Sequence, residues 1–203
     1  MPQTHIMHHN SNPHSYLIST IYRSARFNGY GRDCAHKRFS FLRGFSFGSV
    51  LDVGSGPCLL RGWLQENGIT ADYEAVDIRA DALALCDCPT YQSIPQGKAF
   101  DLVCLFGTVT FNIGHDEGAN KETLRDLLRQ SIGVCRKWLV FTVFKEGTRE
   151  KYKNSVPRDF FVYFSREEIR EMLEGLGIYR FGIVEDDRLD DQEYFVVCQP
   201  QGS

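Results

Sequence analysis

The chain has 203 residues, of which 42% are hydrophobic and 24% are charged, and its formal net charge is −3. A chain of this size and composition can bury a core without disulfides or metals and is typical of a globular protein. The negative charge and the lack of a long basic run argue against a nucleic-acid partner. No apolar run approaches the ~18 residues of a membrane helix, and the N-terminus lacks a signal-peptide core, so we expect a cytoplasmic protein without a membrane partner.

The first 47 residues differ in composition from the rest of the chain. Residues 1–15 hold four of the six histidines among polar residues, and this composition predicts a disordered tail. Residues 16–47 are rich in aromatic and basic side chains. The pattern predicts a helix over residues 15–25, a turn over residues 28–31 and a second helix over residues 33–42.

A glycine-containing loop between two strand-like runs is the most informative feature of the sequence. The apolar run over residues 49–53 leads through Gly54 and Gly56 into a helical pattern. The next strand-like run, over residues 72–77, ends in Asp77, which lies 21 residues after the second glycine. Glycines let the backbone approach a ligand, and a carboxylate at the next strand tip receives ribose hydroxyls. The combination predicts a nucleoside site.

Strand-like and helical runs alternate along the chain, which predicts an α/β fold with a mostly parallel sheet. The predicted strands cover residues 49–53, 72–77, 90–94, 101–106, 138–144, 180–185 and 194–199. The predicted helices of this part cover residues 59–67, 80–85, 122–132 and 166–176. Ser165 and Glu168 form a capping box before the last helix, and Gly177 is expected to end it. The short link between the last two strands favours an antiparallel hairpin.

The seven cysteines are scattered through the predicted strands and helices. Cys104, Cys135 and Cys198 lie in apolar runs and are expected to be reduced core residues. Cys86 and Cys88 are separated by one residue, a spacing too tight for the usual zinc pair, and no second pair follows at a finger-like distance. The sequence therefore predicts no metal site.

The segment from Val50 to Pro57 resembles motif I of the class I S-adenosylmethionine-dependent methyltransferases, and Asp77 resembles the ribose-binding acid of that family. NAD-binding domains share the architecture but place a third glycine where this chain has Leu59. The resemblance spans about residues 30–199, and over this range the chain is similar to a subgroup of small bacterial methyltransferase-domain proteins. It departs from many family members at Cys58, where they have glycine.

The resemblance implies a three-layer, Rossmann-like α/β fold with a seven-stranded, mostly parallel sheet whose last strand is antiparallel. Residues 48–203 would form the methyltransferase domain. Residues 16–47 would form a helical lid, or their aromatic side chains would simply pack on the sheet. The implied cofactor is S-adenosyl-L-methionine.

The implied cofactor-binding residues lie at or just after the carboxyl ends of the first four predicted strands. Ile78 would pack on adenine, and Ser93 stands near the place where the family often has an acid after the third strand. Asp52 would organise the loop or accept from the cofactor ammonium group. The complete set is Asp52, Gly54, Ser55, Gly56, Asp77, Ile78, Ser93, Phe106 and Gly107.

The acceptor is expected at the end of the fourth strand, because open α/β sheets hold ligands at the carboxyl ends of their strands. His115 is a candidate general base or an exposed loop histidine. Within the polar segment 145–161, Tyr152 and Phe160 would shape the acceptor pocket or serve as packing aromatics. The candidates for binding the acceptor are Tyr30, Phe111, Asn112 and Tyr163.

These features predict transfer of a methyl group to an oxygen or nitrogen of a small-molecule, sugar-like or lipid-like acceptor. Residues 107–112 do not match the Asn-Pro-Pro-Tyr or Asp-Pro-Pro-Tyr motif of enzymes that methylate nucleic-acid amino groups. The alternative is a catalytically inactive S-adenosylmethionine-binding regulatory or scaffold protein, suggested by Cys58 and by the missing acid after the third strand. A nicotinamide-dependent oxidoreductase is a third, weaker hypothesis.

Overall fold

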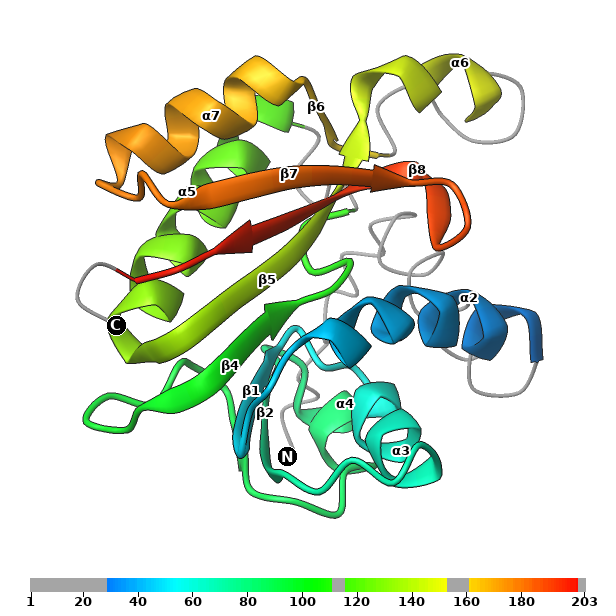
Figure 1. Ribbon diagram of the computed structural model, residues 1–203, viewed down its shortest axis with the longest axis vertical. Helices are drawn as coiled ribbons and strands as arrows, with labels where there is room; N and C mark the ends of the chain where they lie inside the picture. The colour runs from blue at the N-terminus through cyan, green and yellow to red at the C-terminus, as the bar shows by residue number, and fades with distance from the viewer. Residues whose placement is uncertain (1–28, 111–115, 153–160, 201–203) are drawn as a thin grey trace, which may run out of the picture.

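The computed structural model describes residues 29–110, 116–152 and 161–200 (Figure 1). The strands are β1 (Ser49–Val53), β2 (Asp72–Val76), β3 (Thr90–Tyr91), β4 (Phe100–Leu105), β5 (Cys135–Lys145), β6 (Tyr163–Phe164), β7 (Phe181–Asp186) and β8 (Asp190–Cys198). The α-helices are α2 (Gly29–Phe39), α3 (Leu59–Glu66), α4 (Ala80–Leu83), α5 (Glu117–Val134), α6 (Arg149–Tyr152) and α7 (Arg166–Gly175). Two 3-10 helices, η1 (Ser40–Gly44) and η2 (Glu146–Thr148), complete the set.

The strands form one sheet in the order β3-β2-β1-β4-β5-β8-β7, and β6 pairs with the end of β5. β8 lies antiparallel between β5 and β7, whereas the pairings among β1 to β6 are parallel. The chain builds outward from β1 to β3 and then returns to the other side of β1 with β4. The predicted fold class is therefore confirmed, and the direction of winding reverses between β1 and β4, where sheets of this kind bind ligands.

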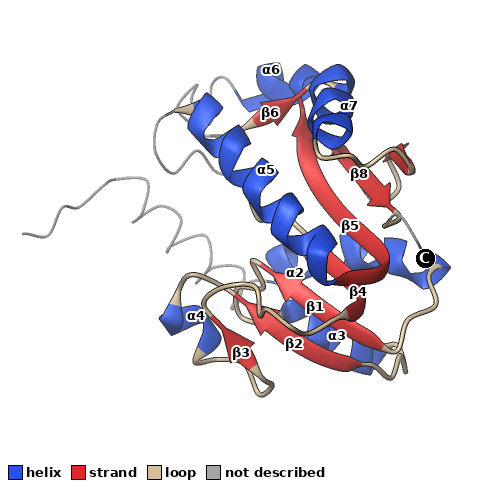
Figure 2. Ribbon diagram, turned by 90° about the vertical axis from the view of Figure 1, so that its left-hand side faces the viewer, coloured by secondary structure: helices blue, strands red, loops and turns tan. Residues whose placement is uncertain are grey.

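Helices cover both faces of the sheet, which gives three layers (Figure 2). On one face, α5 and α7 pack through Leu124, Leu128 and Ile169 against inward-facing residues of the central strands. On the other face, α2 and α3 pack through Phe39 and Trp63. Two apolar clusters result, one on each side of β1 and β4. This burial on both faces explains why the central strands read as nearly continuous apolar runs.

The register of β1 and β2 places their carboxyl ends level with each other. Asp52 pairs with Ala75 and Val53 with Val76, so the loop after β1 begins beside the end of β2. Side chains alternate between the two faces of a strand. Leu51 therefore faces the cluster under α5, whereas Val50 faces the cluster under α3.

The N-terminal helix is the main departure from the sequence-based secondary structure. A turn was predicted over residues 28–31, yet α2 is helical from Gly29. Its end packs against the body of the protein: Phe39 is buried, and Arg38 pairs with Glu193 of β8. These contacts outweigh the ~1 kcal/mol that each glycine costs in a helix. The helix predicted over residues 15–25 and the tail over residues 1–15 lie outside the described residues.

Several element boundaries also differ from those predicted. β3 has two residues instead of five, and β6 and α6 were not predicted. α5 begins five residues before the predicted start because Asp116 caps it, its side chain accepting from the backbone N–H of Ala119 at 3.1 Å. The capping box of Ser165 and Glu168 is confirmed before α7. The antiparallel pairing of β7 with β8 confirms the predicted hairpin.

Among the helices described, none has both the length and the apolar composition needed to cross a bilayer.

Candidate functional site: a glycine loop facing an acidic strand end

The loop after β1 folds over the end of β2. Gly54 and Gly56 have φ angles of 76° and 53°, in the left-handed region that glycine adopts without steric cost. The backbone N–H groups of Gly54 and Ser55 both donate to the carbonyl of Val76, at 2.7 and 3.0 Å. These bonds bring the loop against the residue that follows β2, which is Asp77.

The end of β4 closes on the same loop from the other side. The hydroxyl of Thr108 donates to the carbonyl of Val53 at 2.6 Å. A Cβ atom added to Gly54 would lie 2.5 Å from the Thr108 Cγ2 atom. Only glycine fits at this position, because its φ angle and the space available both exclude a side chain.

Asp77 is the acid that the sequence places at this site, and the structure brings it to the loop. Its side chain is largely buried, and one carboxylate oxygen accepts from the backbone N–H of Gly56 at 2.9 Å. The other oxygen accepts from the N–H of Arg79, also at 2.9 Å. A carboxylate has about four acceptor positions. After these two bonds Asp77 still has lone pairs with which to accept from the two hydroxyls of a ribose.

Ile78, the next residue, is an exposed apolar side chain beside this acid. Its exposed fraction is 76%, which is high for a large hydrophobic residue. Such a side chain can bury its surface under a flat aromatic ring. Its position next to Asp77 is therefore suited to contact a base attached to the ribose.

Asp52 lies two residues before the loop and is buried between β1 and β2. It accepts a hydrogen bond from the hydroxyl of Tyr73 at 2.5 Å. Burial raises the pKa of Asp52 from 3.8 to about 7, the bond from Tyr73 opposes this rise, and the negative charge of Asp77 adds to it. The contact with Tyr73 joins the two strands directly beneath the loop, so Asp52 has the geometry for organising the loop. Its predicted contact with a cofactor ammonium group remains a prediction.

Cys58 ends the loop and forms a disulfide with Cys86, which sequence analysis did not predict. Cys58 has a left-handed φ of 57°, unusual for a residue with a side chain. The Cys88 sulfur lies 3.9 Å from the Cys58 sulfur, and the Cys86 sulfur lies 3.7 Å from the carbonyl oxygen of Gly56. Because 28 residues separate the bonded cysteines, only the crossover through β2 and α4 brings them together. The three cysteines that were expected in the core, Cys104, Cys135 and Cys198, are free and buried, as predicted.

The remaining cofactor candidates are Ser55 within the loop and Ser93, Phe106 and Gly107, which lie outside it. The Ser55 hydroxyl is buried and has no hydrogen-bond partner within the described residues. The Gly107 N–H donates to the Thr142 hydroxyl at 3.0 Å, which ties the end of β4 to β5. Phe106 packs edge-on against Phe39 of α2, with ring centroids 5.5 Å apart. Ser93 is exposed beyond the short β3.

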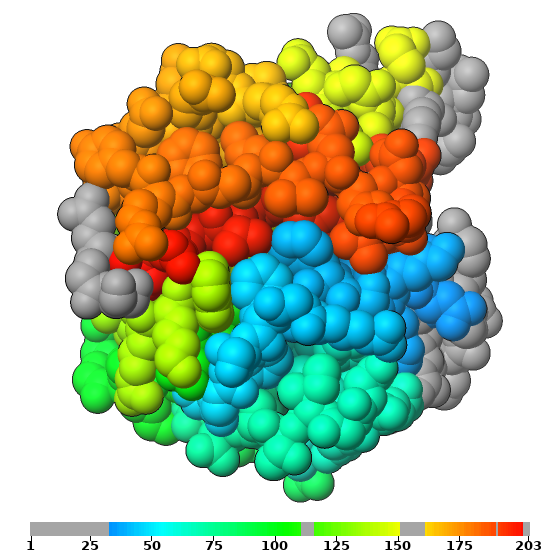
Figure 3. Space-filling view, in the orientation of Figure 1, coloured from blue at the N-terminus to red at the C-terminus, as the bar shows by residue number. Residues whose placement is uncertain are grey.

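The aromatic side chains after α2 pack on the sheet. Phe41 lies 4.9 Å from Phe195 and Phe45 lies 5.2 Å from Trp138, measured between ring centroids. This agrees with the packing interpretation of the segment 16–47 for its described part. Figure 3 shows α2 lying over this face between α3 and the β7–β8 hairpin. A role as a lid stays a prediction.

The acceptor candidates are described only in part. Tyr163 is buried in β6, where it stacks on Phe144 with ring centroids 6.2 Å apart and holds the Arg149 guanidinium 4.7 Å above its ring. Burial raises the pKa of Tyr163, although the charge of Arg149 opposes the rise. Phe111, Asn112, His115 and Phe160 lie outside the described residues, as do the side chains of Tyr30 and Tyr152.

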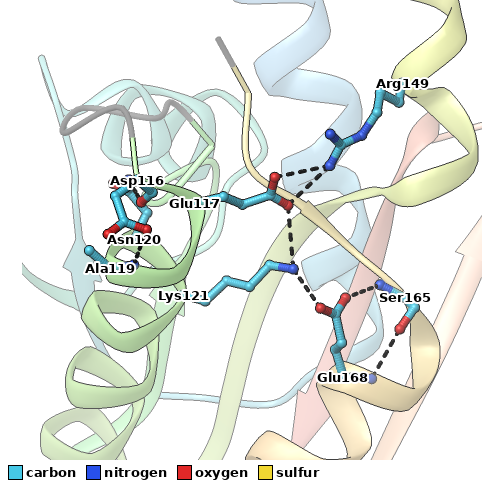
Figure 4. Close-up of polar contacts among 8 residues, drawn as sticks. All are labelled: Asp116, Glu117, Ala119, Asn120, Lys121, Arg149, Ser165 and Glu168. Atoms are coloured by element: carbon cyan, nitrogen blue, oxygen red, sulfur yellow. Dashed lines mark hydrogen bonds and ion pairs between the residues drawn. The ribbon is translucent and has the colours of Figure 1, made fainter. Parts of the chain in front are cut away.

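A network of charged side chains near Tyr163 was not predicted (Figure 4). Arg149 of α6 donates to both carboxylate oxygens of Glu117, at 3.1 and 3.0 Å. Lys121 lies 3.4 Å from the same carboxylate and 2.5 Å from Glu168 of α7. Glu168 also accepts from the N–H of Ser165. The network joins α5, α6 and α7, and sequence patterns missed it because its partners are 32 and 47 residues apart.

The described fold is that of the class I methyltransferases, and solved structures of such proteins resemble it. No family model and no curated protein matches the sequence. The plantazolicin methyltransferase BpumL, solved with a monoazolic desmethylPZN analog and SAH, is 12% identical with a TM-score of 0.66, over 94% of this chain and 91% of that chain. A SAM-dependent methyltransferase from Archaeoglobus fulgidus is 17% identical with a TM-score of 0.59, over 83% of this chain and 94% of that one. An O-methyltransferase family protein from Burkholderia thailandensis is 10% identical with a TM-score of 0.60, over 89% and 58%. At these identities the likeness establishes the fold.

Proposed function

We propose that the chain is an S-adenosylmethionine-dependent methyltransferase that acts on an oxygen or nitrogen of a small-molecule acceptor. The observation that carries the proposal is the contact between the Asp77 carboxylate and the N–H of Gly56, at 2.9 Å. It unites the two sequence features from which a nucleoside site was predicted. The solved proteins of the same fold support it, since the BpumL structure holds SAH, the demethylated form of the cofactor.

The residues present fit an adenosyl group. The lone pairs left on Asp77 can accept from a ribose diol, and the exposed side chain of Ile78 can lie under the base. The loop has no room for a side chain at Gly54, so a ligand can approach its backbone closely there. The buried Ser55 hydroxyl has no hydrogen-bond partner within the described residues and can bond to the bound group. Buried polar groups normally find a partner.

Bound S-adenosylmethionine supplies a methyl group on a sulfonium that leaves as a neutral thioether, so the chain needs no metal or covalent catalysis for the transfer itself. The chain's task is to align the acceptor atom with that methyl group and to exclude water. Asp77 and the loop would fix the adenosine end at the β1 and β2 edge. The acceptor would enter beside the ends of β4 and β5, where Gly107 and Tyr163 lie. His115 is the proposed base for an acceptor hydroxyl or amine.

Calorimetric titration with S-adenosylmethionine and with its demethylated product tests the cofactor assignment. Asp77→Ala is expected to weaken binding roughly 10- to 100-fold, because a hydrogen bond to a charged group contributes about 1.5–3 kcal/mol. Asp72→Ala is the matched control, since Asp72 is an exposed acid at the opposite end of the same strand. Failure of the parent chain to bind either compound at high micromolar concentration would refute the proposal.

Transfer itself is tested by incubating the chain and a cell extract with methyl-labelled cofactor. A labelled small-molecule product that depends on the intact Asp77 site is expected. Tight cofactor binding without any labelled product would favour the alternative of a regulatory or scaffold protein. The disulfide-bonded Cys58, at a loop position where many methyltransferases have glycine, is the feature that suggests this alternative. The two outcomes separate binding from catalysis.

A further inference from the structure

Three cysteine sulfurs gather directly beneath the proposed cofactor loop. Cys58, Cys86 and Cys88 bring their sulfur atoms within 4.8 Å of one another. Cys58 is buried, while the other two are partly exposed to solvent. Cys86 and Cys88 are close in sequence, and the fold adds the third sulfur, that of Cys58, from the end of the loop. The proposed methyltransferase chemistry uses none of these thiols.

The spacing of the sulfurs is that of ligands around one metal ion. Zinc binds thiolates at ~2.3 Å in a tetrahedral arrangement, which places neighbouring sulfurs roughly 3.8 Å apart. The Cys58 and Cys88 sulfurs are 3.9 Å apart. The Cys58 and Cys86 sulfurs, now joined by the disulfide, need only separate to a similar distance after reduction.

We propose that, with the Cys58–Cys86 disulfide reduced, the three cysteines form a thiolate site for one thiophilic cation, with Zn²⁺ as the representative ion. Three protein ligands leave the fourth tetrahedral position to a water molecule. The partly exposed Cys86 and Cys88 give the ion and this water a path from solvent. The proposal is independent of the methyltransferase assignment, because it rests on the sulfur positions alone.

The backbone that carries the three sulfurs is held by short local contacts. The N–H of Cys58 donates to the Ser55 carbonyl at 3.1 Å, and the N–H of Cys86 donates to the Leu83 carbonyl at 3.0 Å. Cys58 directly precedes α3, and Cys86 follows α4 within a few residues. Such anchoring keeps the ligands near one another without the metal, so little chain entropy is lost when an ion binds.

The oxidation state decides whether the site exists. In the disulfide form Cys88 is the one member of the three-cysteine cluster that keeps a thiol, and one thiol cannot hold the ion. A dithiol reductant gives two electrons and two protons to the Cys58–Cys86 bond and itself becomes a disulfide, which leaves three thiols. Zinc binding then displaces the thiol protons to solvent. The site is therefore formed by reduction and abolished by oxidation.

The test titrates Zn²⁺ into the full chain, reduced with a dithiol under argon and then freed of reductant, against a chromogenic chelator. One Zn²⁺ per chain is expected, and Co²⁺ in its place should give thiolate-to-cobalt charge-transfer absorption. Cys58→Ser and Cys88→Ser are each expected to lose more than the ~10- to 100-fold in affinity that removal of an outer-sphere partner causes. Cys34→Ser is the matched control, because it removes a free cysteine outside the cluster.

A second measurement on the unmutated chain guards against variants that fail to fold. Zinc should protect Cys58, Cys86 and Cys88 from alkylation, as mapped by mass spectrometry, while Cys34 reacts at its zinc-free rate. The oxidised chain should show neither thiolate-to-cobalt absorption nor zinc protection of Cys88 from alkylation, and both should appear after dithiol treatment. Absence of stoichiometric zinc on the reduced, folded chain, or equal zinc affinity in the Cys88→Ser variant, would overturn the proposal.

Discussion

The two halves of the sheet hold their carboxyl ends in different ways. At β1 and β2 the loop is fixed by backbone hydrogen bonds to Val76 and by the buried Asp77. At β5 and β6 the neighbouring helices are fixed by long charged side chains, with Arg149, Glu117 and Lys121 at the centre. The first arrangement depends on backbone groups, which most side-chain substitutions leave in place. The second depends on side chains and can be altered by single substitutions.

An ion pair between Arg38 and the buried Glu193 connects the two halves. Arg38 of α2, over the β1 side, lies 2.7 Å from Glu193 of β8, whose side chain has no exposed surface. A Cβ atom added to Gly107 would lie 4.0 Å from the Arg38 guanidinium, so the arginine also borders the end of β4. This pair is the place where a single change should affect both regions.

The largest loss of stability is expected from Arg38→Met. The change removes the Arg38 guanidinium from the buried Glu193 carboxylate. Removing one member of a buried ion pair costs up to about 3–5 kcal/mol. Urea unfolding measures this loss. Lys37→Met is the control, because Lys37 is exposed on the same helix and should change stability by less than about 0.5 kcal/mol. The double change Arg38→Met with Glu193→Gln should recover part of the loss. Equal unfolding midpoints for Arg38→Met and Lys37→Met would contradict the prediction.

A pH-dependent effect is expected from Asp52→Asn on the β1 side. The native pKa of Asp52 is about 7 against an ordinary value of 3.8, so between these values the native state retains a proton that the unfolded chain releases. The free energy of unfolding of the parent chain should therefore fall as pH rises from 4 to 7 because of this group. At 1.36 kcal/mol per unit, a shift of about 3 units sets an upper limit of about 4 kcal/mol.

Urea unfolding of both chains at pH 4, 6 and 8 measures this effect. The asparagine variant should gain stability relative to the parent as pH rises, with no further gain above the native pKa. Tyr73 can still donate to the amide oxygen of the variant, so the bond between β1 and β2 is kept. A stability difference that is constant across the three pH values would show that Asp52 titrates normally.

Gly54→Ala tests whether the loop tolerates a side chain. The new Cβ would meet Thr108 at 2.5 Å and would occupy a left-handed conformation. That conformation costs about 1–2 kcal/mol and overpacking about 1–3 kcal/mol, so a loss of about 3 kcal/mol is expected. Cofactor affinity should fall as well, because the backbone moves. Gly62→Ala in α3 has open space around the new Cβ and should be neutral or slightly stabilising.

The parts of this site that could be predicted from the sequence are those set by residues within a short stretch of chain. Gly54 and Gly56 require a left-handed backbone and Asp77 is a strand-end acid. The structure bonds Gly56 to Asp77 and Gly54 to Val76, the residue before that acid. The local turn signal at Gly29 gave a wrong prediction, because the packing of the helix end keeps Gly29 helical. Local pattern is reliable where the backbone itself imposes the residue type.

The contacts that sequence could not predict depend on crossovers. Cys58 meets Cys86 only after β2 and α4 have folded back, and Lys121 meets Glu168 across 47 residues. Charged and thiol side chains tolerate many neighbours, so nothing in their local sequence identifies the partner. Cys58 follows β1 whereas Cys86 and Cys88 precede β3, and β2 lies between these strands, so no local pattern places the three sulfurs together.

The smallest effect is expected in the charged network, from Lys121→Met. Lys121 bridges Glu117 and Glu168 near the surface, and exposed pairs contribute about 0.2–1 kcal/mol each. Burial alone would raise the pKa of Glu168, but the bonds from Lys121 and Ser165 outweigh it and lower that pKa. The contribution of Lys121 is therefore present above the ordinary glutamate pKa and is lost as pH falls through the lowered value.

Urea unfolding at low and high salt, at pH 7 and pH 3, measures this contribution. A loss of about 1 kcal/mol is expected at pH 7 and low salt, shrinking with added salt and with acid. Arg125→Met is the control, because Arg125 pairs only with the exposed Glu122 among the ion pairs described for it. If the Lys121 variant lost as much stability at high salt as at low salt, its side chain would act through packing on Phe164, over whose ring it lies at 5.1 Å. The helices beside β5 and β6 would then be held by packing instead of by charge, and the difference between the two halves of the sheet would be refuted.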